Sequence, residues 1–243
     1  MIGWRARLGI LVPPGNPTLE AELSTVAVPG VTLHYTRMNA TGETGSLAGQ
    51  EERNREQIAG LEGNVELLSM VKPRVVALAH TATSYTLGRA DEAALIARIE
   101  QRFGLHFVTA FGSIVSGLQR LGLRRIAFGT PYAMEATLRG KALLEEHGFA
   151  VVSHVNLPGV RNIYDETAER AYTLGRMVDH AEAEAVVISG VGMPTLAMIA
   201  ALERDIGKPV ISATSATIWN ALRTADVREG LPNLGTLLAA GIT

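Results

Sequence analysis

The stretch that decides the fold is Arg74-Val-Val-Ala-Leu-Ala-His80-Thr-Ala-Thr-Ser84, an apolar run that ends in a hydroxyl-rich turn. A second stretch repeats this pattern, Ala185-Val-Val-Ile-Ser-Gly190-Val-Gly-Met-Pro-Thr195. Continuous apolar runs of strand length are typical of parallel sheets that helices cover on both faces. The two stretches therefore predict a buried strand followed by a turn in each of two equivalent halves.

Two further pairs of segments support a duplication. Residues 7–13 match residues 125–131, since both are strand-like runs that end in proline, and residues 107–118 match 210–222 with one inserted residue. A period of about 110 residues is too long for a solenoid and fits two homologous lobes. We place the first lobe at 1–113 together with 218–243, and the second at 114–217.

Short apolar runs alternate with longer amphipathic patterns, which favours βαβ units. Strands are expected at 7–12, 32–36, 74–79, 106–109, 125–130, 150–154, 185–189 and 209–213. Helices are expected at 92–102, 134–146 and 196–205, each followed by a glycine, and at 166–180 with Asp165 as N-cap. The fold class is α/β, with two pseudo-symmetric lobes, each a parallel four-stranded sheet flanked by helices. Ligands of such sheets bind beyond the carboxyl ends of the strands, so the site is expected at the lobe interface.

Composition excludes several classes of function. The 243 residues are 47% hydrophobic and carry 22 basic and 24 acidic side chains, with no basic block that would favour nucleic-acid binding. No apolar run approaches the ~20 residues of a membrane span. Because the chain has no cysteine, it has no disulfide, thiolate metal site or thiol nucleophile. A strand-like run at 8–12 leaves no room for a signal peptide, and we expect a cytoplasmic protein.

Several motifs together carry a family resemblance over almost the whole chain. They are Gly9-Ile-Leu-Val-Pro-Pro-Gly-Asn16-Pro-Thr18, Thr130-Pro-Tyr132, Asn162, Ser189-Gly-Val-Gly-Met-Pro-Thr195 and Pro232-Asn-Leu-Gly235. The chain resembles the Asp/Glu racemase superfamily and, within it, maleate cis-trans isomerase and arylmalonate decarboxylase. The resemblance implies two pseudo-symmetric lobes around a cleft for a small carboxylate substrate, with no metal and no organic cofactor. Lobe-interface enzymes of this kind are often homodimers, although the sequence shows no interface signature.

The chain departs from that family at the residues that carry its chemistry. In the isomerases and racemases each of the two turns presents a cysteine, and arylmalonate decarboxylases keep only the second. Here His80 stands at the first position and Gly190 at the second. The resemblance therefore implies the fold, whereas the mechanism has to be argued from the residues present.

Three side chains are candidate donors to the substrate. The resemblance implies that the amide of Asn16 hydrogen-bonds a carboxylate, the alternative being an asparagine that only stabilises its turn. The phenol of Tyr132 could donate to a carboxylate or to a developing enolate oxygen, the alternative being a rim tyrosine. Asn162 is the third candidate donor, through its amide, by the same resemblance.

Backbone amides of the two turns are the second group of candidates. Thr81, Ala82, Val191 and Gly192 lie where a turn opens a helix, and free N–H groups at such a point bind anions. Two facing turns would hold a dianionic carboxylate or an enolate; the alternative is that the hydroxyl residues only cap helices. Gly190 leaves space for water or a larger substrate group, or else permits close packing under the turn.

His80 is the candidate proton carrier. Imidazole has an ordinary pKa near 6.5, and partial burial at the end of an apolar strand favours the neutral base. The alternative is a structural histidine, as we interpret the other five. The glycine-rich segment 42–49 lacks a P-loop motif and is expected to be a mobile loop over the cleft. The acidic and basic residues of 50–66 are expected to form the solvated face of a helix.

The sequence thus predicts a cofactor-independent lyase or isomerase that passes through an enolate-like intermediate with His80 as the single base, of the decarboxylase, tautomerase or hydratase type. Two alternatives stay open. One is a non-catalytic carboxylate-binding relative of the maleate isomerases. The other is a racemase or isomerase that uses water or hydroxyl groups in place of cysteines.

Overall fold

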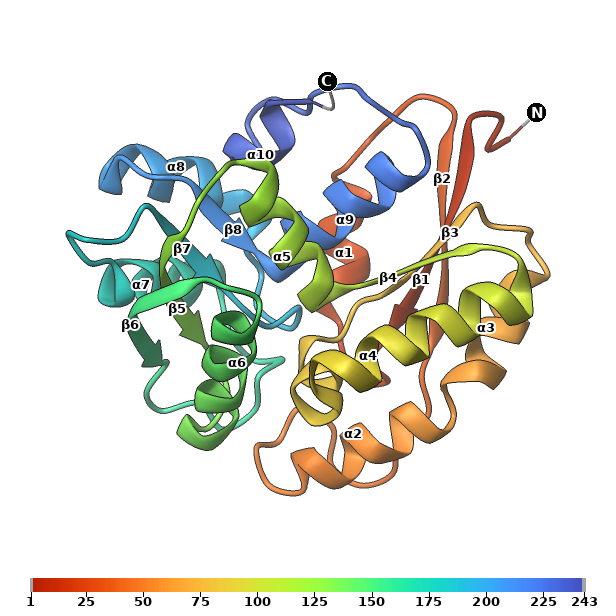
Figure 1. Ribbon diagram of the computed structural model, residues 1–243, viewed down its shortest axis with the longest axis horizontal. Coiled ribbons are helices and arrows are strands. Elements are labelled where there is room, and N and C mark those ends of the chain that lie inside the picture. Colours follow the sequence, from red (N-terminus) through yellow and green to blue (C-terminus); the bar gives the residue numbers. More distant parts are fainter. Residues whose placement is uncertain (1, 242–243) are drawn as a thin grey trace.

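The computed structural model describes residues 2–241 and shows two sheets of four parallel strands (Figure 1). The first has the order β2-β1-β3-β4, made of β1 Ala6–Val12, β2 Val31–Arg37, β3 Val75–Leu78 and β4 His106–Thr109. The second repeats it as β6-β5-β7-β8, made of β5 Arg125–Thr130, β6 Ala150–Asn156, β7 Ala185–Ile188 and β8 Val210–Ser212. The predicted fold class and the eight predicted strands are confirmed. We call the parts around these sheets lobe one and lobe two.

Helices cover both faces of each sheet. In chain order they are α1 Thr18–Ser24, α2 Gln50–Ala59, α3 Leu61–Ser69, α4 Thr81–Phe103, α5 Ala110–Arg120, α6 Met134–Glu146, α7 Ala168–Val178, α8 Leu196–Ile206, α9 Ala213–Thr224 and α10 Thr236–Ala239. Each of the three predicted glycine-terminated helices is present, although α4 begins at the end of the preceding turn and is kinked at Gly88, where φ is 73°. The predicted N-cap Asp165 is wrong. Helix α7 begins later because the hydroxyl of Thr167 accepts the backbone N–H of Arg170 at 3.3 Å.

Burial on both faces explains why the central strands are apolar throughout. In β3, Val75 and Ala77 point into the core that continues into lobe two, whereas Val76 and Leu78 pack beneath α3 and α4. All four side chains are fully buried. Each large aliphatic side chain buried in this way contributes about 1.5–3 kcal/mol, which fixes the strand in the middle of its sheet.

Helices α5 and α9 join the two lobes. They pack against each other between the sheets, and each begins with a hydroxyl cap, Thr109 accepting from Gly112 and Ser212 accepting from Ser215. The equivalent caps on equivalent helices reflect the duplication seen in the sequence. Because both sheets run toward the seam between the lobes, the turns after β3 and β7 lie on either side of it.

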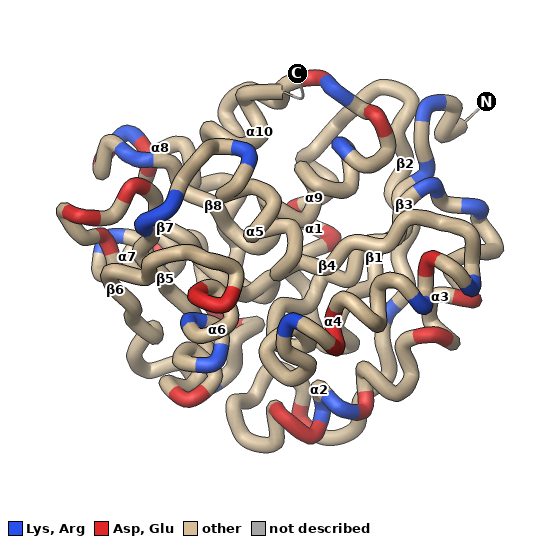
Figure 2. Tube along the Cα trace, viewed as in Figure 1, with Lys and Arg blue, Asp and Glu red and all other residues tan. Residues whose placement is uncertain are grey.

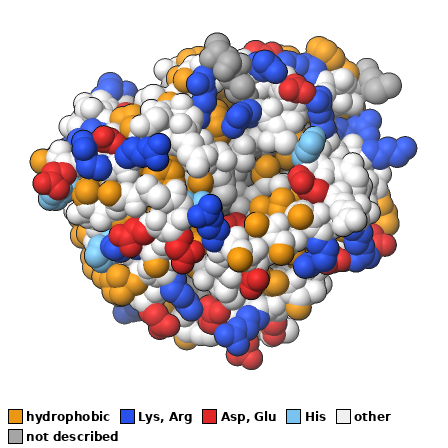
Figure 3. Space-filling view, in the orientation of Figure 1, with side chains coloured by type: hydrophobic (Ala, Val, Ile, Leu, Met, Phe, Trp, Pro, Cys, Tyr) orange, Lys and Arg blue, Asp and Glu red, His pale blue; other side chains and the backbone are white. Residues whose placement is uncertain are grey.

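The surface carries no large region of one charge on the face drawn in Figure 3, where basic and acidic side chains are interspersed. Most charged residues lie on the outer parts of the lobes, and few lie along the central seam (Figure 2). None of the helices within residues 2–241 combines the length and hydropathy needed to cross a bilayer.

Candidate functional site

The turns after β3 and β7 contact each other across the lobe interface. His80 is the extended residue before α4, and residues 189–195 lead from β7 into α8. The hydroxyl groups of Tyr85, in the second turn of α4, and Ser189 are hydrogen-bonded to each other, although the two residues are 104 positions apart in the chain. Strand geometry and this contact therefore bring the two predicted turns to one place.

Four backbone N–H groups at these turns have no hydrogen-bond acceptor in the part of the chain that the structure describes. Among the described residues, none accepts from the N–H of Thr81, Ala82, Val191 or Gly192. All four residues are buried. The first N–H groups of a helix lack partners within the helix and carry partial positive charge, so a buried set of them favours an anion.

Tyr132 links the same turns from the loop after β5. Its hydroxyl lies 3.0 Å from Oγ1 of Thr81, and its ring meets that of Tyr85 edge to face at 6.1 Å. Burial raises the pKa of the Tyr132 phenol to about 12, so the hydroxyl keeps its proton near neutral pH and can donate it in a hydrogen bond.

Asn16 connects the loop after β1 to the second turn. Its Oδ1 accepts the N–H groups of Thr18 and Leu19 at 2.8 and 3.1 Å, which caps α1. Its Nδ2 donates to the carbonyl of Val191 at 3.0 Å. One N–H of the amide is left, because Nδ2 carries two. The side chain thus stabilises its turn and keeps one N–H that is not engaged by these bonds.

His80 is 6% exposed and lies at the edge of a small cavity. Its Nδ1 is 2.8 Å from Oγ1 of Thr83. Burial, assisted by the nearby positive charge of Arg53, lowers the pKa of His80 to about 4, so the imidazole is neutral at pH 7. A neutral imidazole beside N–H groups without acceptors has the protonation state of a general base.

The cavity has a volume of about 20 Å³, room for about one water molecule. One wall of the cavity is the face of α2 that carries Gln50, Arg53, Asn54 and Gln57. Residues 44–46 cover the cavity. Pro14, His80, Ile163 and Tyr164 complete the lining. Of the predicted site residues, His80 alone lines this cavity, whereas Asn16, Thr81 and Tyr132 are buried with their hydrogen bonds between the turns.

Asn162 is placed differently from the other candidates. Its Nδ2 donates to the carbonyl of Thr44 at 3.1 Å, and its Oδ1 accepts the N–H of Tyr164 at 2.9 Å. The neighbouring N–H of Ile163 donates to the carbonyl of Gly45 at 2.9 Å. Asn162 therefore ties lobe two to the glycine-rich loop that covers the cavity, and its amide is engaged there.

Gly190 has a backbone φ of 122°, a value that residues with a side chain rarely adopt. A Cβ there would lie 2.9 Å from Cδ of Pro131 and 3.4 Å from the Tyr132 hydroxyl oxygen. Gly192 is also tightly packed, since its added Cβ would lie 2.9 Å from Cδ1 of Tyr164. Both glycines let the second turn approach the aromatic side chains closely.

Of the charged residues predicted to form a solvated face, Arg53 instead lies in the wall of the cavity, together with three neutral side chains of α2 that the sequence analysis did not single out. Asn54 and Gln57 are buried, and with Gln50 and Arg53 they face the cavity. The spacing i, i+3, i+4, i+7 places these four side chains on one helix face, and that spacing was the signal available in the sequence. Tyr164 was also missed: it lines the cavity, and its ring lies against the glycine at 192.

Comparisons with known proteins agree with this arrangement. The family described as arylmalonate decarboxylase matches residues 8–238. Maleate isomerase of Nocardia farcinica is 28% identical over 248 residues, which cover 96% of this chain and 95% of that protein. Arylmalonate decarboxylase of Bordetella bronchiseptica is 31% identical over 155 residues, covering 62% and 65%.

Solved structures share the fold over nearly the whole chain. A maleate isomerase variant from Pseudomonas putida S16 with maleate superposes with a TM-score of 0.88 at 24% identity, covering 98% of this chain and 99% of that one. A variant of the Nocardia farcinica maleate cis-trans isomerase with a covalently bound succinylcysteine intermediate gives 0.86 at 26% identity, covering 97% and 98%.

Proposed function

The chain belongs to the arylmalonate decarboxylase family, and on that premise we propose that it is a cofactor-independent lyase or isomerase of small carboxylates. The reaction passes through an enolate-like intermediate, and His80 is the single proton carrier. Its curated relatives are isomerases and a decarboxylase, which supports catalysis in general terms. The finer assignment rests on the residues of this chain.

One observation carries the proposal: buried N–H groups without acceptors on two turns that face each other. A carboxylate bound there places its oxygens against Thr81 and Ala82 on one side and Val191 and Gly192 on the other. When the α-carbon loses CO2 or a proton, its electron pair spreads onto these oxygens. Donors already aimed at this charge lower the barrier, each by about 3 kcal/mol, because they need no reorganisation.

His80 then handles the proton. In a decarboxylation the C–C bonding electrons stay on the substrate as the enediolate, CO2 leaves, and a proton drawn from solvent is delivered through the imidazole to the α-carbon. In a tautomerisation the imidazole removes one α-proton and returns it at another atom. The bound anion opposes the effects of burial and of Arg53, since a neighbouring negative charge raises the pKa of an imidazole.

Thiol chemistry is not part of the proposal. The succinylcysteine of the Nocardia enzyme is a covalent adduct on a cysteine, and this chain contains no cysteine. Isomerisation of maleate through such an adduct therefore has no nucleophile here. Proton transfer on one face of the α-carbon needs only the imidazole.

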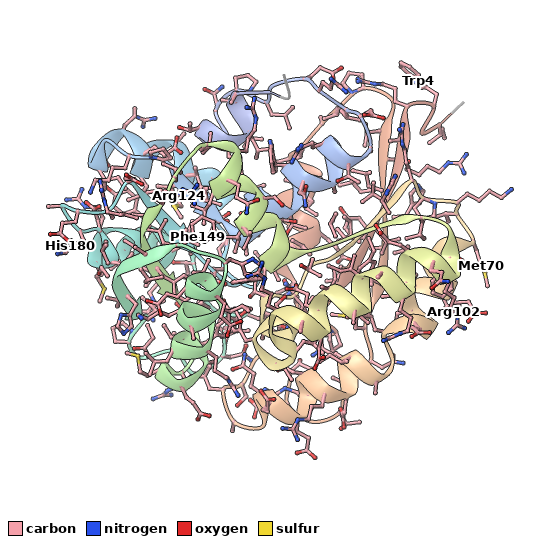
Figure 4. The ribbon with its side chains drawn as sticks, in the orientation of Figure 1. Trp4, Met70, Arg102, Arg124, Phe149 and His180 are labelled. Carbon is pink, nitrogen blue, oxygen red and sulfur yellow. The ribbon has the colours of Figure 1, made fainter. Side chains whose placement is uncertain are left out.

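The test is proton NMR in D2O with malonate-type acids and the corresponding monoacids. We expect loss of CO2 or exchange of the α-proton, and we expect His80→Ala to reduce the rate by ~10²–10⁴-fold. His180→Ala is the matched control, because His180 is exposed at the outer edge of lobe two (Figure 4). Binding of these acids without exchange or turnover in the wild type would contradict the proposal and identify a carboxylate-binding protein instead.

A further inference from the structure

The cavity beside His80 contains a single charged side chain, Arg53. The other described residues that line it have no ionisable charge at pH 7, and this includes His80, whose lowered pKa keeps its imidazole neutral. Within residues 2–241 no carboxylate lies within 4.0 Å of the guanidinium, which instead donates to the carbonyls of Ser46 and, at 2.7 Å, Ala48. Arginine has five N–H donors in a planar fork, so these two bonds leave three unused.

Neutral polar groups adjoin this cation. Asn54 and Gln57 are 3% and 5% exposed, a rare degree of burial for amides that line a space. Oε1 of Gln57 is buried and has no hydrogen-bond partner in the described structure. An unpaired buried acceptor costs about 1–3 kcal/mol, and a ligand that donates to it removes that cost.

We propose that this face of α2, made of Gln50, Arg53, Asn54 and Gln57, is a second subsite that binds a distal carboxylate of the substrate. Arg53 pairs with that carboxylate, and Oε1 of Gln57 accepts from a hydroxyl or N–H group beside it. This inference rests on the proposed function, because it takes the reacting carboxylate to lie at the two turns. The substrate is then a small polar acid with one carboxylate at the reacting carbon and a second carboxylate at the far end of its substituent. An acid whose substituent is apolar does not fit this subsite.

Occupation of this subsite is coupled to the loop above it. The carbonyls that Arg53 holds belong to residues 46 and 48, in the segment that also bonds Asn162 and Ile163. A cavity of about 20 Å³ is too small for such an acid. The loop must therefore move outward on binding, and the incoming carboxylate replaces or shares its bonds to Arg53.

Two malonates of equal shape test the proposal. Carboxymethylmalonate and isobutylmalonate differ in a branched terminal group that is charged in the first and apolar in the second. By isothermal titration calorimetry we expect the wild type to prefer carboxymethylmalonate by about 10- to 100-fold, the range of a hydrogen bond to a charged group. Equal affinity, tighter binding of isobutylmalonate, or no binding of either acid would overturn the proposal.

Variants separate this inference from the proposed function. Arg53→Met should abolish the preference for carboxymethylmalonate over isobutylmalonate, and Arg53→Lys should retain part of it because lysine keeps the charge. Arg55→Met is the control, since Arg55 lies on the outer side of the same helix with a 74% exposed side chain. If folded Arg53→Met still prefers carboxymethylmalonate, the subsite is refuted, whatever the turnover. If Arg53→Met loses the preference but the wild type shows no turnover, only the catalytic proposal is refuted.

Discussion

The hydroxyl of Tyr132 lies 3.0 Å from the hydroxyl of Thr81, so a side chain of lobe two completes the turn that begins α4 in lobe one. Neither lobe alone holds this pair. The contact places a protonated phenol beside N–H groups that lack acceptors, and it makes the geometry of the site depend on how the lobes are docked.

Tyr132→Phe removes this hydroxyl and leaves the ring in place. We expect turnover to fall by about 100-fold, because the proposed mechanism assigns this hydroxyl as a donor to the developing oxyanion, and we expect stability to fall by about 1 kcal/mol. Tyr172→Phe is the control, since its hydroxyl bonds Asp205 at the surface of lobe two. An equal effect of the two changes on turnover would contradict a role for Tyr132.

His80 makes stability depend on pH. Its folded-state pKa of about 4 lies below the ordinary 6.5, so its contribution to the free energy of unfolding is present above pH 6.5 and is lost as pH falls toward 4. His80→Asn should remove up to about 3 kcal/mol of this acid dependence. Urea unfolding at several pH values measures it, and an unchanged slope between pH 6.5 and 4 would contradict the burial of a neutral imidazole.

Glu22 of α1 gives the opposite dependence. Its Oε1 accepts the N–H groups of Thr195 and Leu196 at the start of α8, at 2.5 and 2.6 Å, while Oε2 has no partner in the described structure. Burial raises the pKa of Glu22 despite these bonds. The contribution of Glu22 to the free energy of unfolding is therefore full below pH 4.5 and is lost as the pH rises through its raised folded-state pKa. The stability of the wild type relative to Glu22→Gln should fall from pH 4.5 to 7; a constant difference would refute this.

Gly190→Ala should destabilise the protein by about 1–3 kcal/mol, because φ at this residue is 122° and the new Cβ would lie 2.9 Å from Pro131. Gly63→Ala is the control, since a Cβ there meets no atom within 4 Å and alanine favours helix α3. Thermal unfolding compares the two. The same strain applies to a cysteine at residue 190, so introducing one there requires Pro131 to shift.

Asn162→Ala should loosen the loop that covers the cavity, because it removes the bonds to Thr44 and Tyr164. We expect the N–H of Ile163, whose acceptor is Gly45, to exchange about 10-fold faster with deuterium. The amides of β7 serve as the internal control. Unchanged exchange at Ile163 would show that the loop is held by its other contacts.

The sequence by itself determined the parallel lobes, because uninterrupted apolar runs such as 75–79 and 185–188 are stable only where helices cover both faces of a strand. It also placed His80 and Gly190 at equivalent turns, since the duplicated pattern aligns them. The pairings of Tyr132 with Thr81 and of Asn16 with Val191 join residues 51 and 175 positions apart, and no local pattern specifies such contacts.

Only the tertiary structure decided the electrostatics of the site. The low pKa of His80 results from burial and from Arg53, and Arg53 turns inward because the loop carbonyls at 46 and 48 bind its guanidinium. In the sequence, α2 looks like a solvated helix, since arginine and amide side chains are mostly exposed. Residues 44–46 and 163–164 close over that face and turn it into the wall of a cavity.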